Sequence, residues 1–151
     1  MILRPKVGIQ LLYENSKMPV KKKDSDFCYD CYAVSRKEIL PGVYQYGLGF
    51  RYEITGIPDP LRAGFTVRPR SGIYETGLVL CNTPGTCDQD YRGEVKVNFY
   101  HVIKELPIYE VGDRVCQIHF DVTTAVDFVE MEEISTDTVR GETGFGDSGR
   151  K

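Results

Sequence analysis

The sequence predicts an all-β fold, a sandwich or barrel of short strands, and three observations support this. Hydrophobic residues alternate with polar ones wherever a pattern is visible, which is the two-residue period of a half-buried strand. Turn-forming residues separate these stretches at short intervals. No stretch sustains the 3.6-residue period of a long helix. Many short strands joined by frequent turns are typical of sandwiches and barrels.

Five stretches rich in β-branched and aromatic residues carry the strand pattern. The clearest is 94–100, in which Val95, Val97 and Phe99 share one face. The others are 67–69, 78–81, 115–120 and 125–131. Turns between strands are predicted at 41–42, 58–60, 82–85 and 112–113. We expect at most a helical turn or two, at 73–76.

Length and composition indicate one globular domain. The chain has 151 residues, of which 41% are hydrophobic and 27% charged, and no apolar run approaches the roughly 18 residues of a membrane span. The first residues do not predict a signal peptide, and an odd number of cysteines, five, suits reduced thiols. A net charge of -3 argues against a nucleic-acid polymer as partner. We expect a cytoplasmic protein, in the host cell if the source is viral, with no membrane partner.

The C-terminal residues differ in composition from the rest, which predicts a β domain at 1–136 and a flexible flap at 137–151. The stretch from Arg140 to Lys151 contains four glycines and little that is apolar, so it cannot fold alone. Phe145 could stack on a base, while Arg140 and Ser148 could hold phosphate oxygens. Glycines such as Gly146 allow the backbone to approach a ligand closely. The alternative is a disordered terminus.

Two internal segments carry groups suited to a nucleotide. Pro69-Arg70-Ser71-Gly72 offers a cation, a hydroxyl and a glycine to a phosphate chain, although a turn with a surface arginine would look the same. Residues 82–94 contain Asn82, which could pair with a base edge, Asp88, which could take a proton from water, and Tyr91, which could form a wall. An ordinary hairpin loop is the alternative for this segment.

The chain resembles the trimeric dUTPase family, whose sequences carry five motifs in fixed order. The matching segments are 29–33, 69–72, 85–93, 112–117 and 140–149. The resemblance implies a homotrimer of jelly-roll-like β subunits that hydrolyses dUTP to dUMP and pyrophosphate. Such an enzyme limits uracil incorporation into DNA and supplies dUMP for dTMP synthesis. Each site would lie at a subunit boundary, covered by a neighbour's tail.

The resemblance also implies a role for each matching residue. Asp88 would direct water at the α-phosphorus, Tyr91 would exclude a 2′-hydroxyl, and Asn82 would recognise uracil. Asp30 would hold waters of a Mg²⁺ ion bound to the triphosphate. The phosphate contacts would be Arg70, Ser71, Gly72 and Gln117. The tail would cap the uracil with Phe145 beside Gly146, and reach the terminal phosphate with Arg140 and Ser148.

Some features depart from the family pattern. Cys31 and Cys87 stand where larger aliphatic residues are common, and Thr143 and Asp147 alter the tail. Segment 44–62 looks irregular, and its aromatic residues have no motif role, so we expect them to pack in the barrel or at a subunit interface. They are Tyr44, Tyr46, Phe50 and Tyr52.

Several alternatives remain open on sequence alone. A dCTP deaminase would share the fold, and a nucleotide-dependent regulatory module could use segment 44–62 to bind a protein. A zinc site is disfavoured because residues three apart on a strand point to opposite faces, and because the paired spacing of a zinc knuckle is missing. The thiols concerned are Cys28, Cys31, Cys81 and Cys87. His101 and His119 are interpreted as packing or surface residues.

Overall fold

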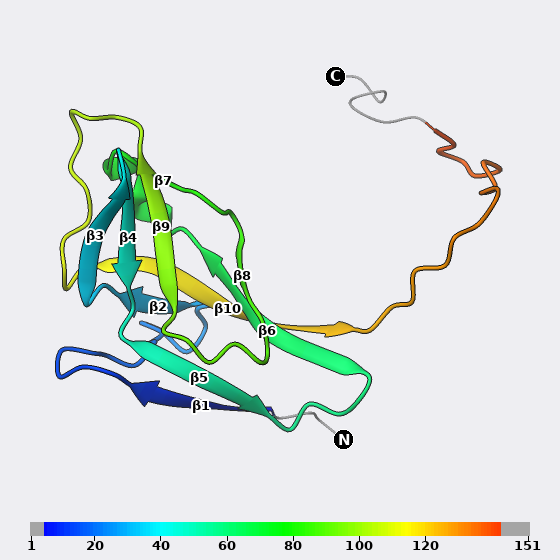
Figure 1. The fold of residues 1–151 in the computed structure, drawn as a ribbon, viewed down its shortest axis with the longest axis horizontal. Helices are drawn as coiled ribbons and strands as arrows, with labels where there is room; N and C mark the ends of the chain where they lie inside the picture. The colour runs from blue at the N-terminus through cyan, green and yellow to red at the C-terminus, as the bar shows by residue number, and fades with distance from the viewer. Residues whose placement is uncertain (1–4, 143–151) are drawn as a thin grey trace.

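The computed structural model describes residues 5–142, which fold into antiparallel strands and one short 3₁₀ helix (Figure 1). This confirms the all-β prediction. The strands are β1 (Lys6–Leu11), β2 (Tyr29–Tyr32), β3 (Ser35–Leu40), β4 (Val43–Gly47), β5 (Phe50–Thr55), β6 (Leu61–Arg68), β7 (Leu78–Leu80), β8 (Gly85–Cys87), β9 (Lys96–His101) and β10 (Arg114–Thr124). The 3₁₀ helix is η1 (Ser71–Glu75).

Three sheets enclose one hydrophobic core. The central sheet has the order β2-β10-β6-β8, the outer sheet has the order β3-β4-β9-β7, and β1 pairs with β5 alone. In Figure 1 the outer sheet stands upright, β10 and β6 run beneath it, and β5 and β1 close the bottom. Tyr46 and Phe99 of the outer sheet are completely buried. They pack into the same core as Val67 and Ile118 of the central sheet.

The central strand pair separates an apolar face from a polar one. β6 and β10 pair continuously from Gln117 opposite Arg68 to Thr124 opposite Leu61. Buried and half-buried residues alternate along β6, as expected for a strand covered on one face. The polar positions of both strands therefore line the face of the central sheet that points away from the core.

Most predicted elements have counterparts in the structure. The stretch 94–100 overlaps β9, and Val95, Val97 and Phe99 are buried as predicted. The stretches 78–81 and 115–120 overlap β7 and β10, whereas 67–69 is only the end of a longer β6. The helical turn is η1, which begins two residues earlier than predicted. Among residues 5–142, no helix is long and apolar enough to cross a membrane.

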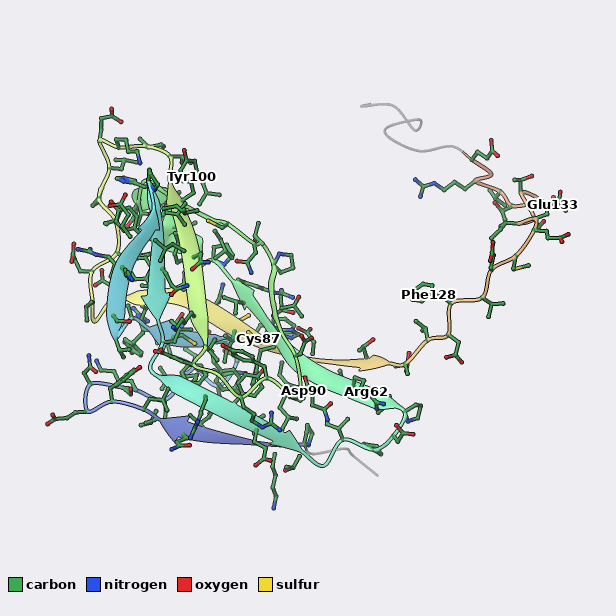
Figure 2. All side chains as sticks on the ribbon, viewed as in Figure 1. Arg62, Cys87, Asp90, Tyr100, Phe128 and Glu133 are labelled. Carbon is green, nitrogen blue, oxygen red and sulfur yellow. The ribbon has the colours of Figure 1, made fainter. Side chains whose placement is uncertain are left out.

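The predicted strand at 125–131 is wrong. β10 ends at Thr124, and the following residues form neither strand nor helix. The chain there leaves the body of the molecule (Figures 1 and 2), and Phe128 is 97% exposed. Alternation makes a segment suitable for a strand, but a strand also needs a neighbour to pair with. None of the strands at 6–124 lies beside this segment.

Segment 44–62 is regular, contrary to its appearance in the sequence. It forms β4, β5 and the start of β6, and β5 alternates strictly between buried and exposed residues. Tyr46, Phe50 and Tyr52 are buried in the core, and Tyr44 packs against it, so the packing prediction is confirmed. Most of the segment is part of the scaffold, and residues 56–60 form the loop that joins β5 to β6.

Candidate functional site

Asp30 lies between two arginines. Its carboxylate accepts hydrogen bonds from Arg70 Nε and Arg114 Nη1, each at 2.9 Å. β2 supplies the carboxylate, β10 begins with Arg114, and Arg70 directly precedes η1. The three side chains are partly buried, with the carboxylate 16% exposed. Charge-assisted contacts of this kind fix the arginines in place, so the carboxylate holds two cationic groups side by side.

Gln117 completes this group, which we call the arginine cluster. It stands opposite Asp30 in the β10–β2 ladder, and its Nε2 donates a 2.9 Å hydrogen bond to the carbonyl of Pro69. That bond holds the segment leading from β6 into η1. A Cβ placed on Gly72 would meet nothing within 4 Å, so the backbone there is open to a ligand. The arginine cluster consists of Asp30, Arg70, Ser71, Gly72, Arg114 and Gln117.

Asp88 is presented by a loop that several contacts hold in place. It follows β8 directly and is exposed. The hydroxyl of Tyr52 donates a 2.5 Å hydrogen bond to the Asp88 carbonyl, and Tyr91 N donates to the same oxygen at 3.2 Å. The Gln89 side chain accepts a 2.9 Å bond from the backbone of Ala63, at the start of β6. We call residues 88–91 the carboxylate loop.

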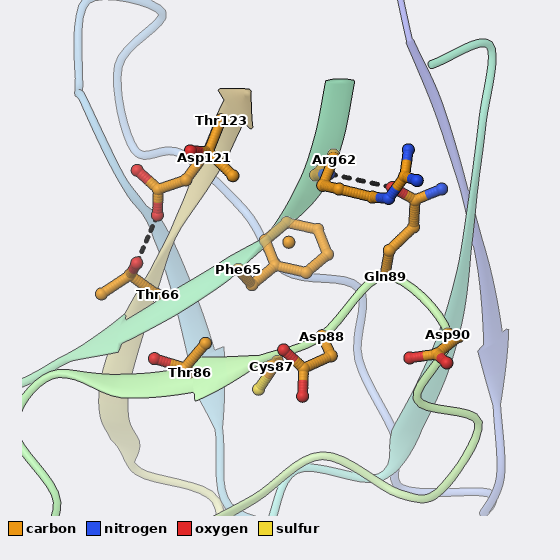
Figure 3. Close-up of a pocket in the computed structure, with 12 residues that line it drawn as sticks. Arg62, Phe65, Thr66, Thr86, Cys87, Asp88, Gln89, Asp90, Asp121 and Thr123 are labelled. Carbon is orange, nitrogen blue, oxygen red and sulfur yellow. Dashed lines mark hydrogen bonds between the residues drawn. The ribbon is translucent and has the colours of Figure 1, made fainter. Parts of the chain in front are cut away.

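A cavity of about 460 Å³ lies beside this loop (Figure 3). Its acidic lining residues are Asp88, Asp90 and Asp121, with Arg62 as a cation at the rim. Burial alone would raise the pKa of Asp121, but hydrogen bonds from Thr66 and His119 hold it below its ordinary value. Three carboxylates facing one cavity repel a triphosphate. This cavity by itself is therefore unsuited to the phosphate chain.

Both histidines have the packing roles predicted for them. His119 Nδ1 donates a 2.7 Å hydrogen bond to the ionised Asp121 carboxylate, and its ring stacks on Phe27 with centroids 4.2 Å apart. His101 contacts the carbonyl of Leu106 at 3.1 Å and meets the ring of Tyr44 edge-on. Each histidine thus fastens a loop to a strand.

The arginine cluster and the carboxylate loop lie apart within one chain. Asp30 is on β2 and Asp88 follows β8, which are the opposite edges of the central sheet. Three strand spacings separate these edges, which amounts to about 14 Å. Asp88 also lies level with Gly64, whereas Arg70 comes after the far end of β6. The single chain does not bring Asp88 to the phosphate-binding residues predicted from sequence.

The remaining residues that were predicted to form the site lie outside the arginine cluster. Asn82 is exposed just before β8, and Tyr91 is 45% exposed with its hydroxyl bonded to the Glu94 carbonyl at 2.9 Å. Residues 82–91 do not form a hairpin of their own, because β8 pairs with β6 while β7 pairs with β9. Arg140 is exposed on the terminal segment. The other tail residues lie outside the described residues: Thr143, Phe145, Gly146, Asp147 and Ser148.

All five cysteines are free thiols. A hydrogen bond that the Cys31 thiol shares with Cys116, together with burial, raises the pKa of Cys31, and burial raises the pKa of Cys87 to about 11. These thiols are therefore protonated and pack as small apolar groups. Within residues 5–142, no group of three or more His, Cys, Asp or Glu side chains is arranged to hold a metal ion.

Three contributors to the site were missed by sequence reasoning. Arg114 lies inside a quoted motif but was given no role, and its pairing with Asp30 depends on the β10–β2 register. Tyr52 and Gln89 anchor the carboxylate loop through backbone atoms. A contact to a distant backbone group leaves no local sequence signal, so only the fold reveals these two.

A glycine in β6 allows Asp88 to sit where it does, and this gives a first prediction. A Cβ on Gly64 would lie 2.6 Å from the Cys87 carbonyl oxygen, so β8 would have to shift. The family resemblance implies that Asp88 activates the attacking water, so Gly64→Ala is expected to lower kcat for dUTP by about 100-fold, since small displacements of such a group are that costly, and to lower Tm. Pyrophosphate release and thermal unfolding would measure both.

The matched control for this substitution is Gly8→Ala on β1, where the nearest atom to a new Cβ is 3.8 Å away. Both kcat and Tm should stay close to wild type in the control. Wild-type kcat in Gly64→Ala would show that the position of β8 does not matter to the chemistry.

Comparison with known proteins points to a single family, the dUTPases. A family model described as dUTPase matches residues 14–149. A deoxyuridine 5'-triphosphate nucleotidohydrolase of Corynebacterium glutamicum is 36% identical over 95% of each chain. The protein with the same description in Corynebacterium diphtheriae is 37% identical and covers 95% of this chain and 92% of its own.

Solved structures of similar fold come from staphylococcal bacteriophages. The 80alpha dUTPase with bound dUPNHPP has a TM-score of 0.75 and 22% identity, and the match covers 95% of this chain and 98% of the phage chain. A mutant dUTPase from phage phi11 of S. aureus, described with a structural Mg(II) ion, has a TM-score of 0.66 and 18% identity. That match covers 85% of this chain and 98% of the other.

Proposed function

The chain belongs to the dUTPase family, and from this membership we propose how its residues perform the family reaction. The chain is a dUTP diphosphatase that converts dUTP and water into dUMP and pyrophosphate. This activity keeps uracil out of DNA and provides dUMP for dTMP synthesis. The observation that carries the residue assignment is the arginine cluster around Asp30, together with the exposed Asp88, whose backbone is anchored by Tyr52.

Asp88 is the proposed base. Its carboxylate accepts a proton from a water molecule as the water oxygen attacks the α-phosphorus in line with the departing bridge oxygen. The bond between the α-phosphorus and that bridge oxygen breaks, and its electron pair leaves with pyrophosphate. The bonds from Tyr52 and Tyr91 to the Asp88 carbonyl hold the base in position, which limits the reorganisation needed in the transition state.

The arginine cluster is the proposed phosphate site. Arg70 and Arg114 each use one donor on Asp30 and retain others for phosphate oxygens, because a guanidinium has five N–H groups. Positive charge that is held in place before the reaction stabilises the negative charge that develops on the phosphates in the transition state. Ser71 and the open backbone at Gly72 add neutral donors, and Gln117 keeps this segment in place.

A Mg²⁺ ion fits the cluster only through its waters. Each Asp30 oxygen accepts one arginine bond and has a further lone pair that can accept from a metal-bound water. The described residues offer no group of acidic side chains for direct coordination, which suits an ion that keeps its waters and binds phosphates. When bound, the ion would neutralise charge on the triphosphate. Asp30 would orient it by accepting hydrogen bonds from its waters.

The complete site is proposed to form between subunits of a homotrimer. Asp30 and Asp88 lie at opposite edges of the central sheet, so one chain cannot place both on one triphosphate. Cyclic symmetry would bring the carboxylate loop of one subunit to the arginine cluster of the next. Residues 137–151 are the proposed flap of this β domain, and Arg140, Phe145, Gly146 and Ser148 are its proposed contacts.

Specificity is assigned to Asn82 and Tyr91. Asn82 is exposed ahead of β8, where its amide can donate to and accept from the uracil edge. Tyr91 is fastened to Glu94 by its hydroxyl, so its ring is a fixed wall. A wall against the sugar rejects ribose by excluding its 2′-hydroxyl.

A nucleotide panel tests this function. The enzyme should release pyrophosphate rapidly from dUTP and slowly from dATP, dCTP, dGTP and dTTP. It should release no ammonia from dCTP. Ammonia from dCTP would favour the deaminase alternative, and binding without turnover would favour a regulatory module. No observation on segment 44–62 favours that module, because its aromatic side chains in β4 and β5 pack in or against the core.

A cytoplasmic location is also part of the proposal. Its support is chemical, since all five cysteines are free thiols, which suits a reducing compartment.

A further inference from the structure

Tyr109 is held firmly in the loop between β9 and β10. Its side chain is nine-tenths buried, and its ring meets Phe99 and Tyr46 edge-on, with centroids 5.8 and 6.4 Å away. Its carbonyl accepts hydrogen bonds from Arg36 Nη1 and from the Tyr46 hydroxyl, both at 2.9 Å. These contacts fix the position of the ring and therefore of its hydroxyl.

The Tyr109 hydroxyl is buried and has no hydrogen-bond partner in the ligand-free chain. Among residues 5–142, it is the one buried side-chain oxygen or nitrogen that lacks a hydrogen-bond partner. An unsatisfied buried hydroxyl destabilises a protein. A phenylalanine would fill the same space without that cost. The hydroxyl therefore calls for a partner that appears only when something binds.

One short turn connects Tyr109 to the arginine cluster. Tyr109 precedes a turn closed by the 2.7 Å bond from Glu110 N to Asp113, and the turn leads directly into Arg114. Burial raises the pKa of the Tyr109 phenol, while the positive charge of Arg70 opposes the rise. The Nη1 atom of Arg70 makes a long contact, 3.5 Å, with the Arg114 carbonyl, which is at the limit of a hydrogen bond.

We propose that Tyr109 is a positioning residue for Arg70 in the substrate complex. When the triphosphate draws the Nη groups of Arg70 away from the Arg114 carbonyl, the Tyr109 oxygen accepts a hydrogen bond from the guanidinium. The phosphate-binding arginine is then held from two sides, by Asp30 at Nε and by Tyr109 at an Nη group. This inference rests on the proposed function, because it needs Arg70 to bind the triphosphate.

Tyr109→Phe tests the proposal by removing one oxygen. KM for dUTP is expected to rise about tenfold, the loss of one hydrogen bond to a charged group, with kcat within about twofold of wild type. Tm should be unchanged or higher, because the ligand-free chain loses only an unsatisfied group. The control is Tyr44→Phe, which changes a half-buried tyrosine on β4 of the outer sheet. KM and Tm of this variant should both stay at wild-type values.

Arg70→Ala separates this inference from the proposed function. If Arg70→Ala leaves KM unchanged, the phosphate site itself is misassigned. If Arg70→Ala raises KM while Tyr109→Phe keeps the wild-type KM, only the role of Tyr109 is overturned. A raised KM accompanied by a lowered Tm in Tyr109→Phe also overturns it, since that result indicates damage to packing. Combining both substitutions should raise KM no further than Arg70→Ala alone, because the hydroxyl would have no guanidinium to hold.

Discussion

Asp88→Asn is expected to lower kcat by about 1,000-fold, the contribution typical of a positioned general base, while substrate affinity changes little. Asparagine matches aspartate in shape, and the loop is held by bonds to the Asp88 backbone carbonyl rather than to its side chain. The substitution should therefore remove the proton acceptor and leave the geometry intact. Pyrophosphate release would measure kcat, and calorimetry with a non-hydrolysable dUTP analogue would measure affinity.

Asp90→Asn is the matched control for this prediction. Asp90 belongs to the same loop, is exposed, and lines the same cavity, so the substitution removes the same charge at nearly the same place. Its kcat should remain within a few-fold of wild type. Equal losses in the two variants would point to the overall charge of the cavity. A kcat near wild type in Asp88→Asn would remove this residue from the chemistry.

Ending the chain after Arg140 is expected to preserve the fold and lower turnover by about 100-fold or more. No core residue lies beyond β10 in the described part of the chain, so Tm should not change. Loss of the flap would leave the reacting groups open to water and without the donors of the tail, and a single such donor is worth about 100-fold or more.

Removing only Arg150 and Lys151 is the control for the truncation. These residues follow the motif-like stretch at 140–149, so turnover should be retained. Full activity in the longer truncation would refute the flap assignment. A lowered Tm in either variant would show instead that the terminal residues stabilise the β domain.

How much the sequence predicts depends on the kind of contact involved. The strand around Phe99 was predictable because its alternation reports burial directly, and the structure confirms it. The strand at 125–131 was not, because the same alternation says nothing about whether a partner strand is present. Segment 44–62 looked irregular because β4 and β5 follow one another across a tight connection, which interrupts the period of two.

In the candidate site, too, some features could be predicted from the sequence and others depend on the fold. Residues of the arginine cluster come from three separate motifs, and it was the resemblance to the family that gave Asp30 a metal role and Arg70 and Gln117 phosphate roles. Sequence could not show that Asp88 lies across the sheet from them, since this depends on the order β2-β10-β6-β8. It also could not show the support that Tyr52 and Gln89 give to backbone atoms. Motifs name the candidate groups, and the strand order shows that one chain holds them at opposite edges of the central sheet.

The central claim is that Asp88 of one subunit acts on a phosphate chain held by Arg70 of another. Two variants, Asp88→Asn and Arg70→Ala, would be co-expressed with different affinity tags, and trimers carrying both tags would be isolated. In such a trimer one boundary in three joins a wild-type Arg70 to a wild-type Asp88. About one third of wild-type activity is therefore predicted, at dUTP concentrations far below the KM of Arg70→Ala, from two parents that are nearly inactive under those conditions. Mixed trimers as inactive as their parents would contradict the claim, because each site would then need both residues from the same chain.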